Sequence, residues 1–110
     1  MAIYSNLTMD QGSNFQATIE VNDSSGNNLN LTGYSVAGQM RKSYASSTAT
    51  DFTASITNAT NGTISISLTA AQTNAIKAGR YVYDVEITSS GNEVSRVVEG
   101  QIEVTPGVTR

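Results

Sequence analysis

Short runs of alternating apolar and polar residues recur along the whole chain, and this pattern restricts the possible folds more than any other feature. Successive side chains of a β-strand point to opposite faces of a sheet, so a run with period two buries one face and exposes the other. Such runs cover Asn14–Val21, Tyr34–Lys42, Asp51–Thr57, Thr63–Leu68, Arg80–Thr88 and Glu93–Val104. Together with a first strand at Ile3–Met9, they predict about seven strands.

Residues typical of turns separate these runs. They occupy segments 22–28, 43–50, 58–62 and 89–92, which are rich in Asn, Ser, Thr and Gly. The dipeptide Asn61-Gly62 favours a reverse turn, so we predict that the strands on either side of it form a hairpin. The segment Ser43–Thr50 is small and polar, and we expect a loop or a weak edge strand there. Leu31, after the first of these turns, is expected to close one end of the core.

One segment has helical features. Thr69 and Gln72 have the spacing of a capping box, in which each side chain binds the backbone N–H of the other residue. Alanines and Ile76 follow, and Gly79 is a typical stop, so the sequence predicts a helix at about Thr69–Ala78. Because so short a helix is not stable in isolation, Ile76 is expected to anchor it to the core.

Tyr81 indicates how the strands are connected. In immunoglobulin-like sandwiches, a tyrosine at the start of a strand follows a short helical crossover, and its hydroxyl binds the backbone a few residues upstream. Here a strand, the capped helical turn, Gly79 and Tyr81 follow in that order. A chain of 110 residues fits one domain. We therefore predict that residues 1–110 form a single all-β domain, an immunoglobulin-like antiparallel sandwich of about seven strands with one short helix crossing between strands.

The composition excludes several kinds of site. The chain has no Cys, His or Trp, so disulfides, thiolate nucleophiles, Cys- or His-bound metals and the commonest general base are absent. With a net charge of −3 and six basic residues, of which only Arg41 and Lys42 are adjacent, we expect no nucleic-acid partner. No apolar run approaches the about 20 residues that span a bilayer, and no signal peptide is visible, so we expect no membrane partner. The low charged fraction of 14% is compatible with packing into a larger assembly.

Asp84 and Glu86 are the first candidates for chemistry. They lie two apart on one face of a strand, so they could act together as acid and base, as two carboxylates do in a glycosidase. The interpretation that we favour is a solvated strand face, and it applies equally to Glu93, Glu99 and Glu103.

Other chemical motifs are missing or have a plainer explanation. The sequence contains no G-x-S-x-G motif and no calcium-loop spacing, and Asp23–Gly26 is interpreted as a turn. Gly79-Arg80-Tyr81 follows a helix rather than preceding one, so it does not form a phosphate loop. The sequence therefore predicts no catalytic, cofactor-binding or metal-ligating residue, no cofactor, and a protein that is not an enzyme.

Tyr81 and Tyr83 allow two interpretations. An exposed pair could form an aromatic platform for sugars. Because both tyrosines share their phase with Val85 and Ile87, we favour positions facing the core. If both are buried, Tyr44 in the small polar loop is the remaining candidate for a sugar contact.

Arg96 breaks the strand pattern. It is in phase with Val94 and Val98, so strict alternation would aim its guanidinium at the core, where an unpaired charge is very costly. A bulge could shift the phase, a carboxylate could pair with Arg96, or this face could belong to a subunit interface. We favour a bulge near Val97-Val98, close to Gly100.

The region from Ile64 to Thr109 carries a recognisable series of residues. It comprises Leu68-Thr69, Gln72-Thr73, Gly79-x-Tyr81-x-Tyr83-Asp84-Val85 and Arg96-x-Val98-x-Gly100-x-Ile102-x-Val104-x-Pro106-x-Val108-Thr109. This series resembles the closing half of small β-sandwich proteins of tailed bacteriophages, which include virion structural proteins and the N-terminal modules of baseplate and tail-fibre proteins. Upstream of this region, only the general layout is similar.

The resemblance implies a non-catalytic virion structural protein that acts by subunit contacts in a tail, baseplate or capsid. Such a protein would be made in the bacterial host cytoplasm and would become part of the virion. Its partners would be other virion proteins, and we expect a homo-oligomer. The alternative is a carbohydrate-binding or adhesin-like β-sandwich module.

Overall fold

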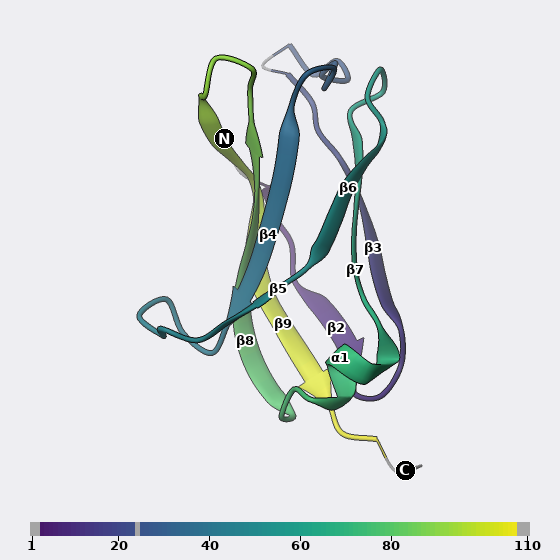
Figure 1. Cartoon of the computed structure of the whole chain (residues 1–110), viewed down its shortest axis with the longest axis vertical. Coiled ribbons are helices and arrows are strands. Elements are labelled where there is room, and N and C mark those ends of the chain that lie inside the picture. The colour runs from purple at the N-terminus through teal and green to yellow at the C-terminus, as the bar shows by residue number, and fades with distance from the viewer. Residues whose placement is uncertain (1–2, 24, 108–110) are drawn as a thin grey trace.

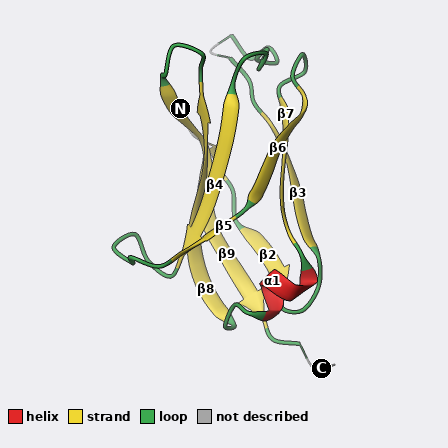
Figure 2. Ribbon diagram, in the orientation of Figure 1, coloured by secondary structure: helices red, strands yellow, loops and turns green. Residues whose placement is uncertain are grey.

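Two β-sheets pack face to face along the molecule, and a short helix covers one end (Figure 1, Figure 2). The computed structural model describes residues 3–23 and 25–107. The larger sheet has six strands in the order β1-β9-β8-β4-β5, with β2 also paired to β9, and the smaller sheet has the order β3-β7-β6. The strands are β1 Ile3–Tyr4, β2 Leu7–Asp10, β3 Phe15–Glu20, β4 Ser35–Arg41, β5 Ala49–Asp51, β6 Thr53–Asn58, β7 Thr63–Leu68, β8 Gly79–Thr88 and β9 Val94–Thr105.

The prediction of an all-β, immunoglobulin-like sandwich with one short crossing helix is confirmed. The hairpin around Asn61-Gly62 is formed by β6 and β7. β8 lies between β4 and β9 in the centre of the larger sheet, antiparallel to both. The described residues form nine strands rather than the about seven expected from the pattern.

The predicted first strand Ile3–Met9 is divided into β1 and β2. Both pair with β9 in parallel, so the larger sheet is mixed rather than fully antiparallel. At the break, the Ser5 N–H donates to the Glu99 carbonyl (2.8 Å), and the side-chain oxygen of Asn6 accepts from the Gln101 N–H (3.1 Å). A side-chain amide thus takes the place of a backbone acceptor, which interrupts the strand without leaving β9 unpaired there.

The other additional strand, β5, lies at the end of the segment where we expected a loop or a weak edge strand. After β5 the chain changes sheets at Phe52, whose N–H donates to the Gly38 carbonyl (2.9 Å) and whose ring is buried. β6 then continues in the smaller sheet. The backbone at Phe52 therefore connects the two sheets along one side of the sandwich.

Aromatic rings lie at the centre of the core. Phe52 packs against Phe15 with 6.1 Å between ring centroids, and against the edge of Tyr83 with 6.3 Å. Fully buried side chains from both sheets and from Leu31 surround them: Met9, Met40, Ile64, Ile66, Val85, Ile102 and Val104. Burial stabilises each side chain of this size by about 1.5–3 kcal/mol, so the core can hold the two sheets together without a disulfide.

The helix α1, Ala70–Asn74, is shorter than the predicted Thr69–Ala78, but its capping box is as expected. Thr69 Oγ1 accepts from the Gln72 N–H (3.2 Å), and Gln72 Oε1 accepts from the Thr69 N–H (2.9 Å). Ile76 is buried, which confirms it as the anchor. The helix ends at Asn74 with Ala75 as its C-cap. Just beyond it, the Ile76 N–H donates to the Thr73 carbonyl (3.1 Å), and the Ile76 carbonyl accepts from the Gln11 side chain (2.7 Å).

Thr73 connects α1 to the turn between β2 and β3. Its side chain is fully buried. Thr73 Oγ1 accepts from the Gly12 N–H (3.1 Å), and its single proton is shared between the carbonyls of Ser13 (2.8 Å) and Ala70 (3.1 Å). Thr73 belongs to the residue series that carries the resemblance, but the sequence did not indicate that it fixes the helix to the turn between β2 and β3.

Tyr81 forms the predicted tyrosine corner. Its hydroxyl donates to the carbonyl of Lys77, four residues upstream, at 2.8 Å. The bond joins the start of β8 to the segment that follows α1. It therefore fixes the angle at which the crossing helix delivers the chain into the larger sheet.

The predicted bulge is also present, at Val97. Val85 pairs with Val98 and Glu86 pairs with Arg96, so Val97 is the additional residue on β9. Val97 and Val98 are both buried, and Arg96 points outward. Our expectation that Val94 shares the inward phase of Val98 is wrong: Val94 is 59% exposed, because the bulge inverts the alternation on its N-terminal side.

Candidate functional site

The outer face of the larger sheet carries most of the charged side chains. Arg96 Nε lies 3.2 Å from Asp84 Oδ2, and Arg96 Nη1 lies 3.7 Å from Glu99 Oε1. Glu86, two residues after Asp84 on β8, is paired directly with Arg96 on β9. Two of our three explanations for Arg96 therefore hold together, since the bulge turns it outward and the carboxylates pair with it.

Asp84 and Glu86 do not form the acid–base arrangement that we considered. Both lie on the open outer face, as a solvated strand face requires, and about half of the Arg96 side chain remains exposed beside Asp84. The hollow next to Asp84 has a volume of about 110 Å³ and contains a single carboxylate among its described lining residues. Ligand pockets are usually about 300–1,000 Å³, so this hollow is small for a substrate.

Tyr81 and Tyr83 face the core rather than forming an exposed platform. Tyr83 is 4% exposed, and its hydroxyl donates to the Ser5 carbonyl at 2.6 Å. Burial raises the pKa of the Tyr83 phenol above its ordinary value. Tyr81 is half-buried, and Lys42 Nζ lies 4.9 Å from its ring centroid. The tyrosine pair is therefore used for packing and for fixing the fold.

Tyr44 remains as an aromatic surface residue. It is 77% exposed and lines the small hollow together with Gln39, Arg41 and Asp84. A second exposed ring, Tyr4 on β1, is 62% exposed. The residue pattern of Ile3–Met9 does not indicate which face of that strand is open, so the exposure of Tyr4 could not be predicted from it.

The outer face of the smaller sheet is polar and nearly free of charge. Along β3, β7 and β6 it presents Gln16, Thr18, Glu20, Thr63, Ser65, Ser67, Thr53, Ser55 and Thr57. In register, Ser65 lies between Thr18 and Ser55, and the Gln16 side-chain amide donates to Ser65 Oγ at 3.2 Å. Glu20 at the edge is the single charged residue of this face.

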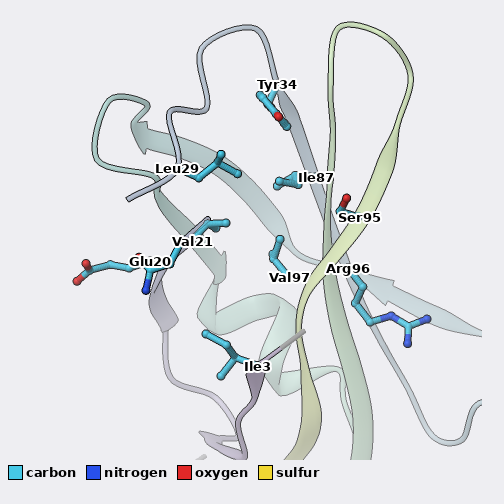
Figure 3. A pocket seen from close by; sticks show the side chains of 10 residues that line it. Ile3, Glu20, Val21, Leu29, Tyr34, Ile87, Ser95, Arg96 and Val97 are labelled. Atoms are coloured by element: carbon cyan, nitrogen blue, oxygen red, sulfur yellow. The ribbon is translucent and has the colours of Figure 1, made fainter. Parts of the chain in front are cut away.

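A cavity of about 280 Å³ opens between the sheets near the N-terminal side (Figure 3). Val21, Leu29, Ile87 and Val97 turn toward it, while the guanidinium of Arg96 points away from it. The carboxylate of Glu20 also points away (Figure 3). Apolar side chains are thus accompanied by polar ones such as Asn22 and Ser95, and the two charged side chains point away from the cavity and from each other.

A larger groove, of about 450 Å³, lies at the helical end between the β4–β5 connection and the segment from Ala75 to Ala78. Ala75, Ala78 and the half-buried Tyr81 contribute apolar surface to it, whereas the side chains of Met40 and Ile76 that line it are buried. Arg41, Lys42 and Lys77 supply cationic side chains, and its described lining residues include no carboxylate. The adjacent pair Arg41 and Lys42 was visible in the sequence, but its proximity to Lys77 was not.

Two further observations concern the described part of the chain. Within residues 3–23 and 25–107, no group of three or more His, Cys, Asp or Glu residues is placed to hold a metal ion. In the same residues, no helix is long and apolar enough to cross a bilayer.

The turn at Asp23 is as expected: Asp23 Oδ1 accepts from the N–H groups of Ser25 (2.9 Å) and Asn27 (3.0 Å), and Ser24 lies outside the described residues.

Comparison with known proteins identifies no family. No protein-family model and no curated protein sequence matches the chain. Among solved structures, the chain is similar to part of a family 123 glycoside hydrolase from Clostridium perfringens, with 13% identity and a TM-score of 0.43. The match covers 97% of this chain and 24% of that protein. A likeness at this level does not establish a shared activity.

Proposed function

We propose that the chain is a non-catalytic structural protein of a tailed-bacteriophage virion, which acts through contacts with other virion proteins and with copies of itself. The proposal starts from the sequence resemblance between Ile64 and Thr109. The tyrosine corner and the bulge both fall within this region.

The observation that carries the proposal is the outer face of the smaller sheet. Three strands present hydroxyl and amide groups in register, with Glu20 as the only charge. Surfaces of freely soluble domains usually mix charges of both signs, and a face without them is suited to lie against another protein. Hydroxyl groups can exchange hydrogen bonds with a partner without the cost of burying an ionised group.

Mass spectrometry of purified particles tests the proposal directly. Peptides of this protein should be present in virions after density-gradient purification and nuclease treatment, at a copy number in the range of other structural components. Immunogold labelling should then place the protein on one part of the particle. If its peptides occur in infected-cell lysate but not in purified particles, the proposal is wrong.

A carbohydrate-binding or adhesin-like module is the second candidate, and one observation favours it. Tyr44 is strongly exposed beside Gln39, Arg41 and Asp84, and an aromatic ring with nearby polar groups can bind a sugar. Binding to a glycan array should then be lost in Tyr44→Ala and kept in Tyr4→Ala, the matched control with the other exposed ring. No glycan signal above background would rule out this candidate.

A further inference from the structure

We propose that copies of this protein associate head to tail, with the β8–β9 hairpin of one copy docked in the groove beside α1 of the next. This inference rests on the proposed function, because it names the self-contact that such a virion protein would use. It follows from the distribution of charge along the molecule and from two surfaces of matching chemistry.

The groove is cationic in a protein that is acidic overall. Both lysines of the chain, Lys42 and Lys77, line it together with Arg41, whereas the whole chain has a net charge of −3. None of these cations forms an ion pair among the described residues. Arg41 is instead bound to neutral oxygens of Ser46 and Gln39. The groove therefore lacks a carboxylate partner.

The opposite end of the molecule is acidic. β8 runs from Gly79, beside the groove, to Thr88 at the hairpin, and a strand of this length spans about 30 Å (Figure 1). Glu93 lies in that hairpin, and Glu20 lines the same cavity as Ile87 and Ser95 of the two hairpin strands. The nearest described cation, Arg96, is paired with Asp84 and Glu99. The cationic groove and the acidic hairpin thus lie at opposite ends of β8, although Asp10 and Glu103 also lie at the helical end.

The hairpin also supplies an apolar side chain of suitable size. Val94, directly after Glu93, is 59% exposed because the bulge at Val97 turns it outward. The hairpin is held in shape by a hydrogen bond from the Ser89 N–H to the Glu93 carbonyl (2.9 Å). A second bond runs from the Glu93 N–H to Ser89 Oγ (3.1 Å). Val94 is therefore presented on a formed turn, next to a carboxylate.

The groove contains a partner of matching chemistry for each of the two groups. The half-buried ring of Tyr81 and the exposed Ala75 and Ala78 offer apolar surface for Val94. Lys42 and Lys77 line the same groove and can meet the Glu93 carboxylate. A second copy is the occupant that we assign, because the acidic hairpin is available on every molecule. Burial of Val94 supplies affinity, and charge complementarity selects the orientation.

Such a contact joins two different surfaces, so it leaves one groove and one hairpin free at the ends of each pair. Contacts of this kind continue into a ring or a filament instead of stopping at a dimer. A hairpin tip in a groove buries less than the about 800 Å² per partner of a standard interface, so we expect weak association in solution. Repeated contacts within a particle would strengthen it.

Cysteine cross-linking tests the orientation, since the natural chain has no cysteine. Equimolar Lys77→Cys and Val94→Cys proteins, mixed and oxidised mildly, should form mostly the mixed disulfide dimer. The chain with both substitutions should form a ladder of covalent multimers. Predominant like-with-like dimers, or no cross-link at concentrations up to about 1 mM, would contradict the head-to-tail contact.

Charge-reversal variants test whether Lys77 and Glu93 attract each other across the contact. Sedimentation equilibrium of the full chain should show association that weakens at least tenfold in Lys77→Glu and in Glu93→Lys, and that recovers in the double variant. The controls Arg80→Glu and Glu103→Lys make the same charge changes outside the groove and the hairpin, and should associate like the natural chain. Raising NaCl from about 0.05 to 0.5 M should weaken association of the natural chain.

The outcomes separate this inference from the proposed function. A strictly monomeric natural chain, or association unchanged by both single variants, refutes the assigned contact. If the protein is nevertheless found in purified particles, its function as a virion component stands and only the contact is wrong. Far-ultraviolet circular dichroism of each variant shows whether it is folded, and failure of one single variant to fold leaves the other and the cross-link to decide.

Discussion

The buried hydroxyl of Thr73 allows a sharp test of how α1 is held. Thr73 is fully buried, and its Oγ1 makes hydrogen bonds to Gly12, Ser13 and Ala70. Thr73→Val keeps the shape of the side chain but removes all three bonds. Thr73→Ser keeps the bonds and removes one methyl group. Comparison of the two substitutions separates the contribution of the hydroxyl from that of packing.

The expected magnitudes follow from the same contacts. An unsatisfied buried polar group costs about 1–3 kcal/mol, and Gly12 and Ser13 lie near enough to water to regain part of their bonds, so Thr73→Val should cost about 2 kcal/mol. Loss of one buried methyl group in Thr73→Ser should cost about 1 kcal/mol. At about 4 °C per kcal/mol for a domain of this size, Tm should fall by about 8 °C in Thr73→Val and by about 4 °C in Thr73→Ser.

Thermal and urea unfolding, followed by circular dichroism because the chain has no Trp, measure both variants. Thr18→Val is the matched control, since Thr18 is exposed on β3 and should tolerate valine within about 0.5 kcal/mol. If Thr73→Val is as stable as Thr73→Ser or more stable, the hydroxyl does not hold the helix and the reasoning fails.

Three further predictions concern the tyrosine corner at Tyr81, the close contact at Gly100 on β9 and the titration of the buried Tyr83 phenol. Tyr81→Phe removes the bond to the Lys77 carbonyl and should lower the free energy of unfolding by about 1 kcal/mol in urea, with no loss of strand content. Gly100→Ala would place a Cβ atom 2.0 Å from the Ser5 carbonyl oxygen, so we expect a cost of about 3 kcal/mol and faster proteolysis of the segment before β2; equal proteolysis rates would contradict this. Because burial raises the pKa of Tyr83, the native state retains its proton where the unfolded chain has lost it, and stability should fall as pH rises above about 10; Tyr83→Phe should remove that part of the pH dependence.

Much of the fold could be predicted because its signals are local. Alternation places side chains on one face or the other within a single strand, and a capping box is complete within four residues. Tyr81 likewise bonds only four residues upstream, at Lys77. These features depend little on what the rest of the chain does, so they survive in the folded protein as the pattern indicates.

The features that the sequence did not reveal depend on contacts between distant residues. Asn6 interrupts the first strand because its side chain meets the backbone of Gln101, 95 residues away. Thr73 meets Ser13 across 60 residues. The bulge was expected near Val97, but its consequence for Val94 depends on the exact pairing of β8 with β9. In each case the decisive partner belongs to another strand, and no periodicity within one segment encodes it.

The groove likewise depends on contacts between distant residues, so it could not be predicted from the sequence. Arg41 and Lys42 are adjacent in sequence, but Lys77 reaches them only because the tyrosine corner folds the segment after α1 back onto the end of β4. Glu93 is carried to the other end by the full length of β8. The net charge of −3 therefore conceals a local cluster of three cations at the groove. Since solvent ions screen charges over about 10 Å, each end acts on a neighbouring molecule by itself, and the arrangement of the charges matters more than their sum.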